Sequence, residues 1–249
     1  MTVRPSWLYA LGSVLIVSLL SLIGLATIRF EEKKLKRIIF VMVSLATGGL
    51  FADALLDLLP ESYRRSGSGA GLLVLAGILL FFVLERFLRW KHGHTLEQTG
   101  ASKTIGYMNL TADSIHNFTD GVIIGVAYLA SIPIGISTTL AVMFHEIPHE
   151  LGNFFVLLYA GFSKTRALLL NFLSAIVAIL GTLLALLIGS RVSSFSHVVL
   201  PLAAGGFIYI AGSDLLPELH KETSLARSLI QLLAMGAGAG MILCLTFFE

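Results

Sequence analysis

The sequence contains very few of the residues on which soluble and disulfide-linked proteins depend. Cys244 is its only cysteine, which excludes an intramolecular disulfide and a metal site built from clustered thiolates. Charged residues make up 13% of the 249 positions, about half the usual share in a soluble domain. Apolar residues make up 56%, and the mean hydropathy is +0.88. This composition indicates a single membrane domain over residues 1–249, and no nucleic acid partner is expected.

Eight apolar stretches are long enough to cross a lipid bilayer. Each has about 20–27 residues, enough for a helix across a hydrocarbon core of about 30 Å. Backbone groups inside lipid must bond within their own segment, so these stretches are expected to be helices. They cover residues 7–28, 38–60, 69–88, 105–130, 133–159, 167–189, 197–217 and 227–248. The sequence therefore predicts an all-α polytopic membrane protein with eight transmembrane helices.

Lysine and arginine are distributed unevenly between the two sides of these helices. The loops after helices one, three, five and seven hold thirteen of them, and the other side holds Arg4, Arg64, Arg65 and Arg191. Cytoplasmic loops of membrane proteins have an excess of Lys and Arg. We therefore expect a multi-pass protein of the plasma membrane, such as a bacterial inner membrane, with both termini outside the cytoplasm.

Residues 45–61 and 202–218 form an internal repeat. They read LATGGLFADALLDLLPE and LAAGGFIYIAGSDLLPE, and ten of seventeen positions match at a constant offset of 157. The same offset superposes helices one to three (7–88) on helices six to eight (167–248), and the copies cross the membrane in opposite directions. Inverted repeats are typical of transporters that expose one site alternately to the two sides. The alternative is that the shared LLPE merely ends a helix at the membrane surface.

The two central helices (105–159) lie outside the repeat and contain polar residues where apolar ones are expected. Each ionisable group near the bilayer centre costs about 2.5–3.5 kcal/mol, so it persists where it faces a polar partner, water or a metal. The two helices are antiparallel and joined by a short turn, which places both polar groups at mid-membrane. These residues are His116, Asn117, Asp120, His145, Glu146, His149 and Glu150.

Imidazole and carboxylate ligands together suit Zn²⁺, Fe²⁺, Mn²⁺ or Cd²⁺ better than Mg²⁺ or Ca²⁺. Two pairs spaced by one helical turn could supply four ligands, His116 with Asp120 and His145 with His149. The residues left for a second ion or for supporting contacts are Asn117, Glu146 and Glu150. The metal would be a transported substrate, and no prosthetic group is expected. The alternative is a hydrogen-bonded network that only holds helices together.

Further polar residues could form steps of an ion path on both sides of this site. Asp57, with Asp53 one turn deeper, lies toward the outer face, and the repeat partner of Asp57 lies toward the cytoplasm. Each of these acids is equally compatible with a cap at a helix end. The full set is Asp53, Asp57, Asn109, Asp113, Asp214 and Glu218. His92 and His94, in the basic loop after helix three, could bind metal weakly or simply be solvated.

At these residues the chain resembles the ZIP (Zrt/Irt-like protein) family of divalent metal transporters. The resemblance covers all eight helices, and its strongest parts are the HNFTDG sequence of 116–121 and the HEIPHELG sequence of 145–152. The second part resembles the subfamily that has H-E-x-P-H-E in helix five. The resemblance implies import of Zn²⁺ and related ions into the cytoplasm by an elevator-like motion.

The resemblance also implies a centre for two metal ions. The first site would comprise His116, Asp120, His145 and His149, and the second Asn117, Asp120, Glu146 and Asn171. Many bacterial members have a carboxylate at the position of His149 and an acid at that of Asn171. These departures remove negative charge from the second site.

Two other interpretations concern chemistry and assembly. His145-Glu146-Ile147-Pro148-His149 matches H-E-x-x-H, in which the Glu of a zinc protease activates a metal-bound water. In intramembrane zinc proteases, however, an Asp-Gly element follows this motif, whereas Asp120-Gly121 precedes it. We therefore expect a transporter and not an enzyme. Small residues of the last helix, Gly236, Gly238 and Gly240, could support close packing within the chain or in a homodimer.

Overall fold

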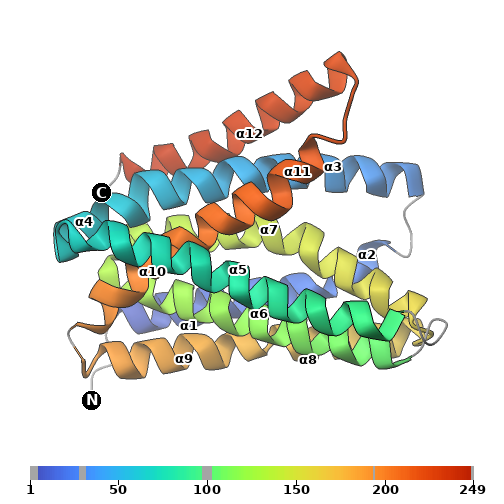
Figure 1. Cartoon of the computed structure of the whole chain (residues 1–249), viewed down its shortest axis with the longest axis horizontal. Coiled ribbons are helices and arrows are strands. Elements are labelled where there is room, and N and C mark those ends of the chain that lie inside the picture. Colours follow the sequence, from blue (N-terminus) through green and yellow to red (C-terminus); the bar gives the residue numbers. More distant parts are fainter. Residues whose placement is uncertain (1–4, 28–31, 97–102, 193, 248–249) are drawn as a thin grey trace.

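The computed structural model describes residues 5–27, 32–96, 103–192 and 194–247, which form one bundle of helices (Figure 1). The described residues make eight rods, some of them divided by a 3₁₀ or π segment. In chain order the rods are α1 (Pro5–Leu19) with η1 (Leu20–Ile23) and α2 (Gly24–Thr27); α3 (Glu32–Ala52) with η2 (Asp53–Leu58) and α4 (Leu59–Ser66); α5 (Gly69–Leu96); α6 (Lys103–Ala130); α7 (Ile132–Tyr159); α8 (Lys164–Ala175) with α9 (Val177–Gly189); α10 (Phe195–Tyr209) with η3 (Ile210–Leu215) and α11 (Leu216–Leu219); and α12 (Leu225–Thr246).

The chain is an all-α polytopic membrane protein. Each rod overlaps one of the eight expected stretches, and six of the described rods are long and apolar enough to cross a membrane. The other two are α6 and α7, whose His, Asp, Asn and Glu side chains lower the mean hydropathy. The crossing of the membrane by α6 and α7 therefore stays a prediction. α1 begins and α12 ends at the same end of the bundle (Figure 1).

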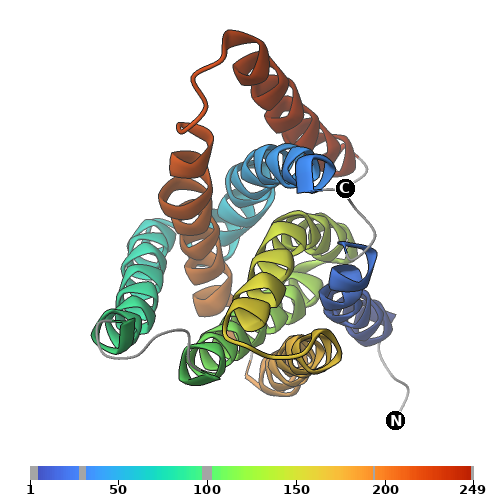
Figure 2. The ribbon, with the colours of Figure 1, turned by 90° about the vertical axis from the view of Figure 1, so that its right-hand side faces the viewer.

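α7 lies in the middle of the bundle (Figure 2), where it contacts α1, α3, α6, α8 and α12. Its start follows from the local sequence. The Ser131 side chain accepts a hydrogen bond of 3.2 Å from the Ile134 backbone N–H, and Pro133 in the first turn has no N–H to leave unpaired. Because Ser131 alone connects α6 to α7, the two helices must run antiparallel side by side.

Glycines bring the backbones of α6 and α9 into direct contact. A Cβ on Gly121 would lie 1.9 Å from the carbonyl oxygen of Ala178, and one on Gly181 would lie 2.1 Å from that of Phe118. Only glycine fits at such a crossing, which is a common way for helices to approach in membranes. Gly121 directly follows Asp120, so this contact fixes how α6 is rotated at the polar residues.

The two segments that match in sequence also match in conformation. α3 and α10 run in opposite directions along the bundle (Figure 1). Each leads into a π segment, η2 at Asp53–Leu58 and η3 at Ile210–Leu215, and these segments are separated by the same 157 residues. Each π segment ends two residues before a proline, Pro60 or Pro217, which cannot donate a helical hydrogen bond.

Contacts between the matching halves are reciprocal. A Cβ on Gly48 of α3 would lie 2.0 Å from the Met235 carbonyl oxygen of α12, and one on Gly205 of α10 would lie 2.1 Å from the Val74 carbonyl oxygen of α5. Val74 of α5 and Met235 of α12 therefore take equivalent places in the two halves. They are 161 residues apart, four more than the 157 that separate Gly48 from Gly205.

Candidate metal centre

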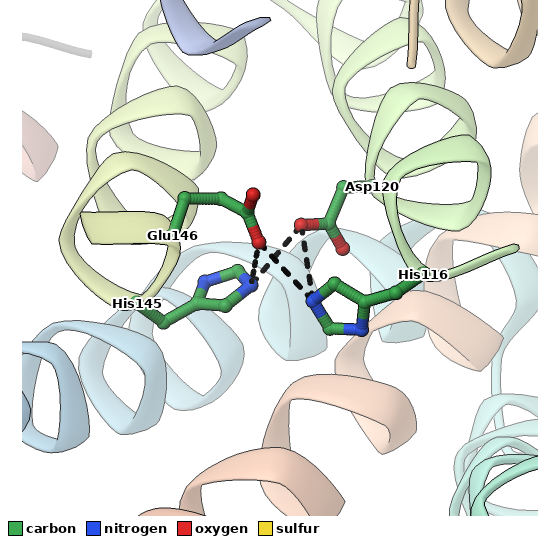
Figure 3. Close-up of side chains that lie close together, drawn as sticks. All are labelled: His116, Asp120, His145 and Glu146. Carbon is green, nitrogen blue, oxygen red and sulfur yellow. Dashed lines mark ion pairs between the residues drawn. The ribbon is translucent and has the colours of Figure 1, made fainter. Parts of the chain in front are cut away.

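Four side chains of α6 and α7 converge on one point in the bundle (Figure 3). His116 and Asp120 come from α6, one turn apart, and His145 and Glu146 are neighbours on α7. One ligand atom of each lies within 4.8 Å of the ligand atoms of the others. The mid-chain polar residues of the two helices therefore meet, as their spacing and common depth indicate.

Distances within this cluster suit a small ion between the four groups. His145 Nε2 lies 3.0 Å from Asp120 Oδ2 and 3.4 Å from Glu146 Oε1. His116 Nε2 lies 3.2 Å from Glu146 Oε1 and 3.7 Å from Asp120 Oδ2. Ligand atoms about 2.0–2.2 Å from a tetrahedral zinc ion are roughly 3.3–3.6 Å apart. The cluster is close to that size without a large rearrangement.

The cluster is buried, and its polar atoms are not satisfied by the protein. Asp120 and Glu146 are each 1% exposed and His145 is 3% exposed. Within the described part of the chain, both oxygens of each carboxylate and the Nε2 atoms of His116 and His145 have no hydrogen-bond partner. Buried polar groups are normally hydrogen-bonded, and buried charges are paired or bind a metal. A divalent cation would neutralise the two carboxylates and use both imidazoles.

The tautomer of His145 is fixed by its own helix. Its Nδ1 atom lies 3.3 Å from the carbonyl oxygen of Ala141, which can only accept a hydrogen bond. Nδ1 therefore donates this hydrogen bond, and Nε2 faces Asp120 and Glu146, where its lone pair would bind a metal ion. Such a contact behind a metal-binding imidazole orients the ring and strengthens it as a ligand.

His149 lies beside the cluster but outside the group of four. Its ring stacks on that of His116, with centroids 4.3 Å apart and an angle of 31° between the planes. Its Nδ1 atom is 3.8 Å from Glu146 Oε1, and the side chain is 36% exposed. The rotation of α7 directs Glu146 at α6 and into the group of four. His149 as a ligand, as the spacing predicts, stays a prediction.

A second polar group is centred on Glu150 and Asn171. Asn171 on α8 donates from Nδ2 to Glu150 Oε2 at 2.5 Å and to the Ser21 carbonyl oxygen at 3.3 Å. The other oxygens of both side chains, and Oδ1 of Asn117, are buried without a hydrogen-bond partner among the described residues. The sequence predicts that Asn117 and Asn171 share a second ion with Asp120 and Glu146, and that Glu150 serves a second ion or a supporting contact. The structure brings Asn171 and Glu150 together, and the second site stays a prediction.

A cavity of about 370 Å³ borders the cluster. Both His116 and His145 line it, as does His149. Three of the expected path residues also line it, namely Asn109, Asp113 and Asp214. All three lie toward the Lys103 end of α6 and the C-terminal end of the α10–α11 rod, which is the side rich in Lys and Arg.

The remaining path residues lie elsewhere. Asp53 accepts hydrogen bonds from Thr138 Oγ1 at 3.1 and 3.2 Å, and Asp57 accepts one from Thr246 Oγ1 at 2.8 Å. Both acids are buried and neither lines the cavity. Glu218 is exposed and pairs with Lys221. The side chains of His92 and His94 lie outside the described residues.

Sequence reasoning assigned no role to Ser174 and Asn153, which contact the polar residues of α6. Ser174 Oγ and Asn153 Nδ2 both donate to the Asp113 carboxylate. Asn153 continues the polar face of α7 one turn beyond His149, and this spacing was a usable signal. Ser174 is a serine in an apolar helix, where such residues are common, so the sequence offered no signal for it.

Comparison with known proteins places this chain in a family. The model described as "ZIP Zinc transporter" matches residues 4–99 and 90–246. The chain belongs to the ZIP zinc transporter family. Zinc transporter SLC39A7 from Canis lupus familiaris is 32% identical over 98% of this chain and 71% of its own length. The Homo sapiens protein of that name is 31% identical over the same shares. Zinc transporter ZIP13 from Pongo abelii is 38% identical over 83% of this chain and 66% of its length.

ZIP membership agrees with the resemblance seen in the two motifs and with the all-helical fold. The relatives are named as transporters, and nothing in them supports the alternative of an intramembrane protease that uses Glu146. In this family the metal is a transported substrate, and the buried cluster is a candidate site for it. Its individual ligands, like the subfamily indicated by H-E-x-P-H-E, stay predictions.

Proposed function

We propose that this protein imports Zn²⁺ into the cytoplasm through the cluster of His116, Asp120, His145 and Glu146. The observation that carries the proposal is the pair of buried, unsatisfied carboxylates facing two imidazoles in a zinc transporter family member. The donor set also accommodates Fe²⁺, Mn²⁺ and Cd²⁺, because nitrogen and oxygen sites select first-row metals weakly. Glu150, Asn117 and Asn171 would hold a second ion less tightly, since only Glu150 among them is acidic.

We propose alternating access by the two inverted halves as the mechanism. The proposal is supported by the different surroundings of two residues that are equivalent in the repeat. Asp214 lines the cavity, whereas Asp57 is buried, with 3% of its surface exposed. The cavity opens at the ends rich in Lys and Arg, which we assign to the cytoplasm. In this state an ion at His145 would leave inward, and the reverse state would expose the same site outward. Both termini would then lie outside the cytoplasm, in a plasma membrane.

Uptake into proteoliposomes tests the proposal. Wild-type protein should accumulate Zn²⁺ down an imposed gradient, and the Asp120→Ala and His145→Ala variants should lose most of this flux, because each removes one of four ligands. Phe155→Ala, at an exposed position of α7 away from the cluster, serves as the matched control and should transport normally. Unchanged metal flux in both ligand variants would refute the assigned site. Competition by Fe²⁺, Mn²⁺ and Cd²⁺ in the same assay establishes the selectivity.

We propose α12 as the contact between two copies in a homodimer. Gly238 is used within the chain, where its Cβ would lie 2.1 Å from the Leu45 carbonyl oxygen, but no heavy atom is within 4 Å of a Cβ on Gly236 or Gly240. These two glycines, four residues apart, can receive a second helix. Gly236→Ile should shift the protein from dimer to monomer in light scattering, and a monomeric wild type would exclude this contact.

A further inference from the structure

Asp113 and Asp120, seven residues apart on α6, are both buried carboxylates, but they differ in their hydrogen bonds. Asp120 is 1% exposed, and neither of its oxygens has a hydrogen-bond partner among the described residues. Asp113 is 2% exposed, yet its two oxygens together accept three hydrogen bonds. A carboxylate without donors needs a cation, whereas one with three donors is already stabilised.

The three donors to Asp113 come from three different helices. Asn117 Nδ2 on α6 donates to Oδ1 at 3.2 Å, and Asn153 Nδ2 on α7 donates to the same oxygen. Ser174 Oγ on α8 donates to Oδ2. Asp113 thus links the two helices that form the cluster to α8, which also supplies Asn171 to the second polar group.

These hydrogen bonds determine which atoms the neighbouring residues present. Asn117 Nδ2 donates both to the Asp113 carboxylate and to its backbone oxygen, each at 3.2 Å, so the amide must present Oδ1 on its other side. That oxygen is buried and has no hydrogen-bond partner in the described ranges. Asn153 Nδ2 also lies 3.3 Å from His149 Nδ1, so the position of Asn153 holds the His149 ring against that of His116.

We infer that Asp113 is a positioning residue for metal transport and not a ligand on the ion path. By accepting hydrogen bonds, Asp113 orients Asn117 directly and orients His149 through Asn153. The transported ion does not bind to the Asp113 carboxylate. This inference rests on the proposed zinc transport through the cluster. It also revises the expectation from sequence, in which Asp113 was a step of the path.

The two roles make opposite predictions for Asp113→Asn. An asparagine keeps one acceptor for Asn117 and Asn153. Its amide N–H can donate to Ser174 Oγ, whose own hydrogen can turn to the Asn171 carbonyl oxygen 2.8 Å away. The geometry therefore survives without the charge. A metal ligand would not survive the same change, because an amide oxygen binds a dication far more weakly than a carboxylate does.

The experiment compares Asp113→Asn, Asp113→Ala and Asp120→Asn with wild type for ⁶⁵Zn²⁺ uptake into proteoliposomes. We expect Asp113→Asn to retain kcat/KM within about threefold of wild type, because its hydrogen bonds are kept. Asp113→Ala should lose about 10–100-fold, the usual effect of removing a residue that orients metal ligands. Asp120→Asn, the matched control on the same helix, should lose nearly all uptake.

The absorption spectrum of bound Co²⁺ provides a second readout, which a general loss of protein stability does not change. With Co²⁺ bound in detergent, the d–d absorption of folded Asp113→Asn should match wild type, whereas Asp113→Ala should shift it. The inference is overturned if Asp113→Asn fails to fold or loses as much uptake as Asp120→Asn, and equally if Asp113→Ala transports like wild type. Absence of uptake by wild-type protein would instead reject the proposed function. If Asp113→Ala does not fold, the two asparagine variants alone decide.

Discussion

Asp57 and Asp214 occupy equivalent positions in the two matching segments but have opposite surroundings. Asp57 is buried and accepts a hydrogen bond of 2.8 Å from Thr246, whereas Asp214 is exposed and lines the cavity beside the metal cluster. Identical local sequences, DLLPE in both cases, therefore end in different environments. The difference lies in how the two halves pack, and it is the observation that supports the proposed alternating access.

This difference predicts unequal reactivity of introduced thiols. In a background with Cys244→Ser, the Asp214→Cys variant should react with a maleimide more than about tenfold faster than Asp57→Cys, because a buried thiol reacts only during local opening. Mass spectrometry of detergent-purified protein over time gives both rates. Equal labelling rates would mean that the two halves are in the same state.

Replacing Asn171 by aspartate should create a stronger second ion site. The change removes the hydrogen bond from Asn171 Nδ2 to Glu150 and sets two carboxylates against each other. Without metal the loss should destabilise the protein by about 1.5–3 kcal/mol, the usual worth of a hydrogen bond to a charged group. With Zn²⁺ the added charge should raise the bound metal from one to two ions per chain. Elemental analysis measures this, and equal stoichiometry in both proteins would contradict the prediction.

Gly121→Ala should disrupt the crossing of α6 and α9. Its Cβ would lie 1.9 Å from the Ala178 carbonyl oxygen, so the helices must separate, at about 1–3 kcal/mol for overpacking. Gly152→Ala on α7 is the matched control, because a Cβ there meets no heavy atom within 4 Å. Thermal unfolding in detergent should show a lower midpoint only for Gly121→Ala. A loss of the same size in Gly152→Ala would contradict this assignment to the crossing, because Ala by itself favours a helix over Gly by about 1 kcal/mol.

Arg65 should stabilise the end of the bundle at which α6 ends. It pairs with Glu61 and donates from Nη2 to the Ala130 carbonyl oxygen at the end of α6, at 3.0 Å. Arg65→Ala should cost about 1.5–3 kcal/mol, because a hydrogen bond from a charged group is lost where Glu61 is only 6% exposed. Chemical unfolding monitored by circular dichroism measures the change.

Arg64→Ala is the internal comparison for this prediction. Arg64 contacts the same Glu61 at 2.6 Å, but its side chain is 75% exposed, so its contribution should be within about 1 kcal/mol. If the two variants unfold alike, the contact of Arg65 with Ala130 contributes nothing measurable.

The sequence alone did not determine which side chains of α7 meet those of α6. Helical spacing placed His145, Glu146 and His149 on neighbouring parts of one face of α7, and a spacing pattern alone could not rank them. The structure directs Glu146 into the group of four and leaves His149 stacked on His116. The rotation of α7 about its own axis decides this, and that rotation results from contacts with five other helices.

The hydrogen-bond partners of the acids were likewise beyond the sequence. Asp113 looked like a step on an ion path because it shares a helix face with His116. Its carboxylate is satisfied by Asn153 and Ser174, and Ser174 lies 61 residues further along the chain. A sequence pattern shows which acids share a face, but it does not show which of them a distant hydroxyl will satisfy.

The sequence by itself determined that this is a helical membrane protein with two polar helices at its centre. Segment length, apolar composition and the spacing of His, Asp and Glu are local properties, and lipid allows the backbone few other conformations. Only the tertiary structure decided which four side chains meet, which carboxylates lack donors and which side the cavity reaches. Those outcomes depend on helix rotation and on glycine contacts such as Gly121 with Ala178, where the absence of a Cβ lets two helices approach closely.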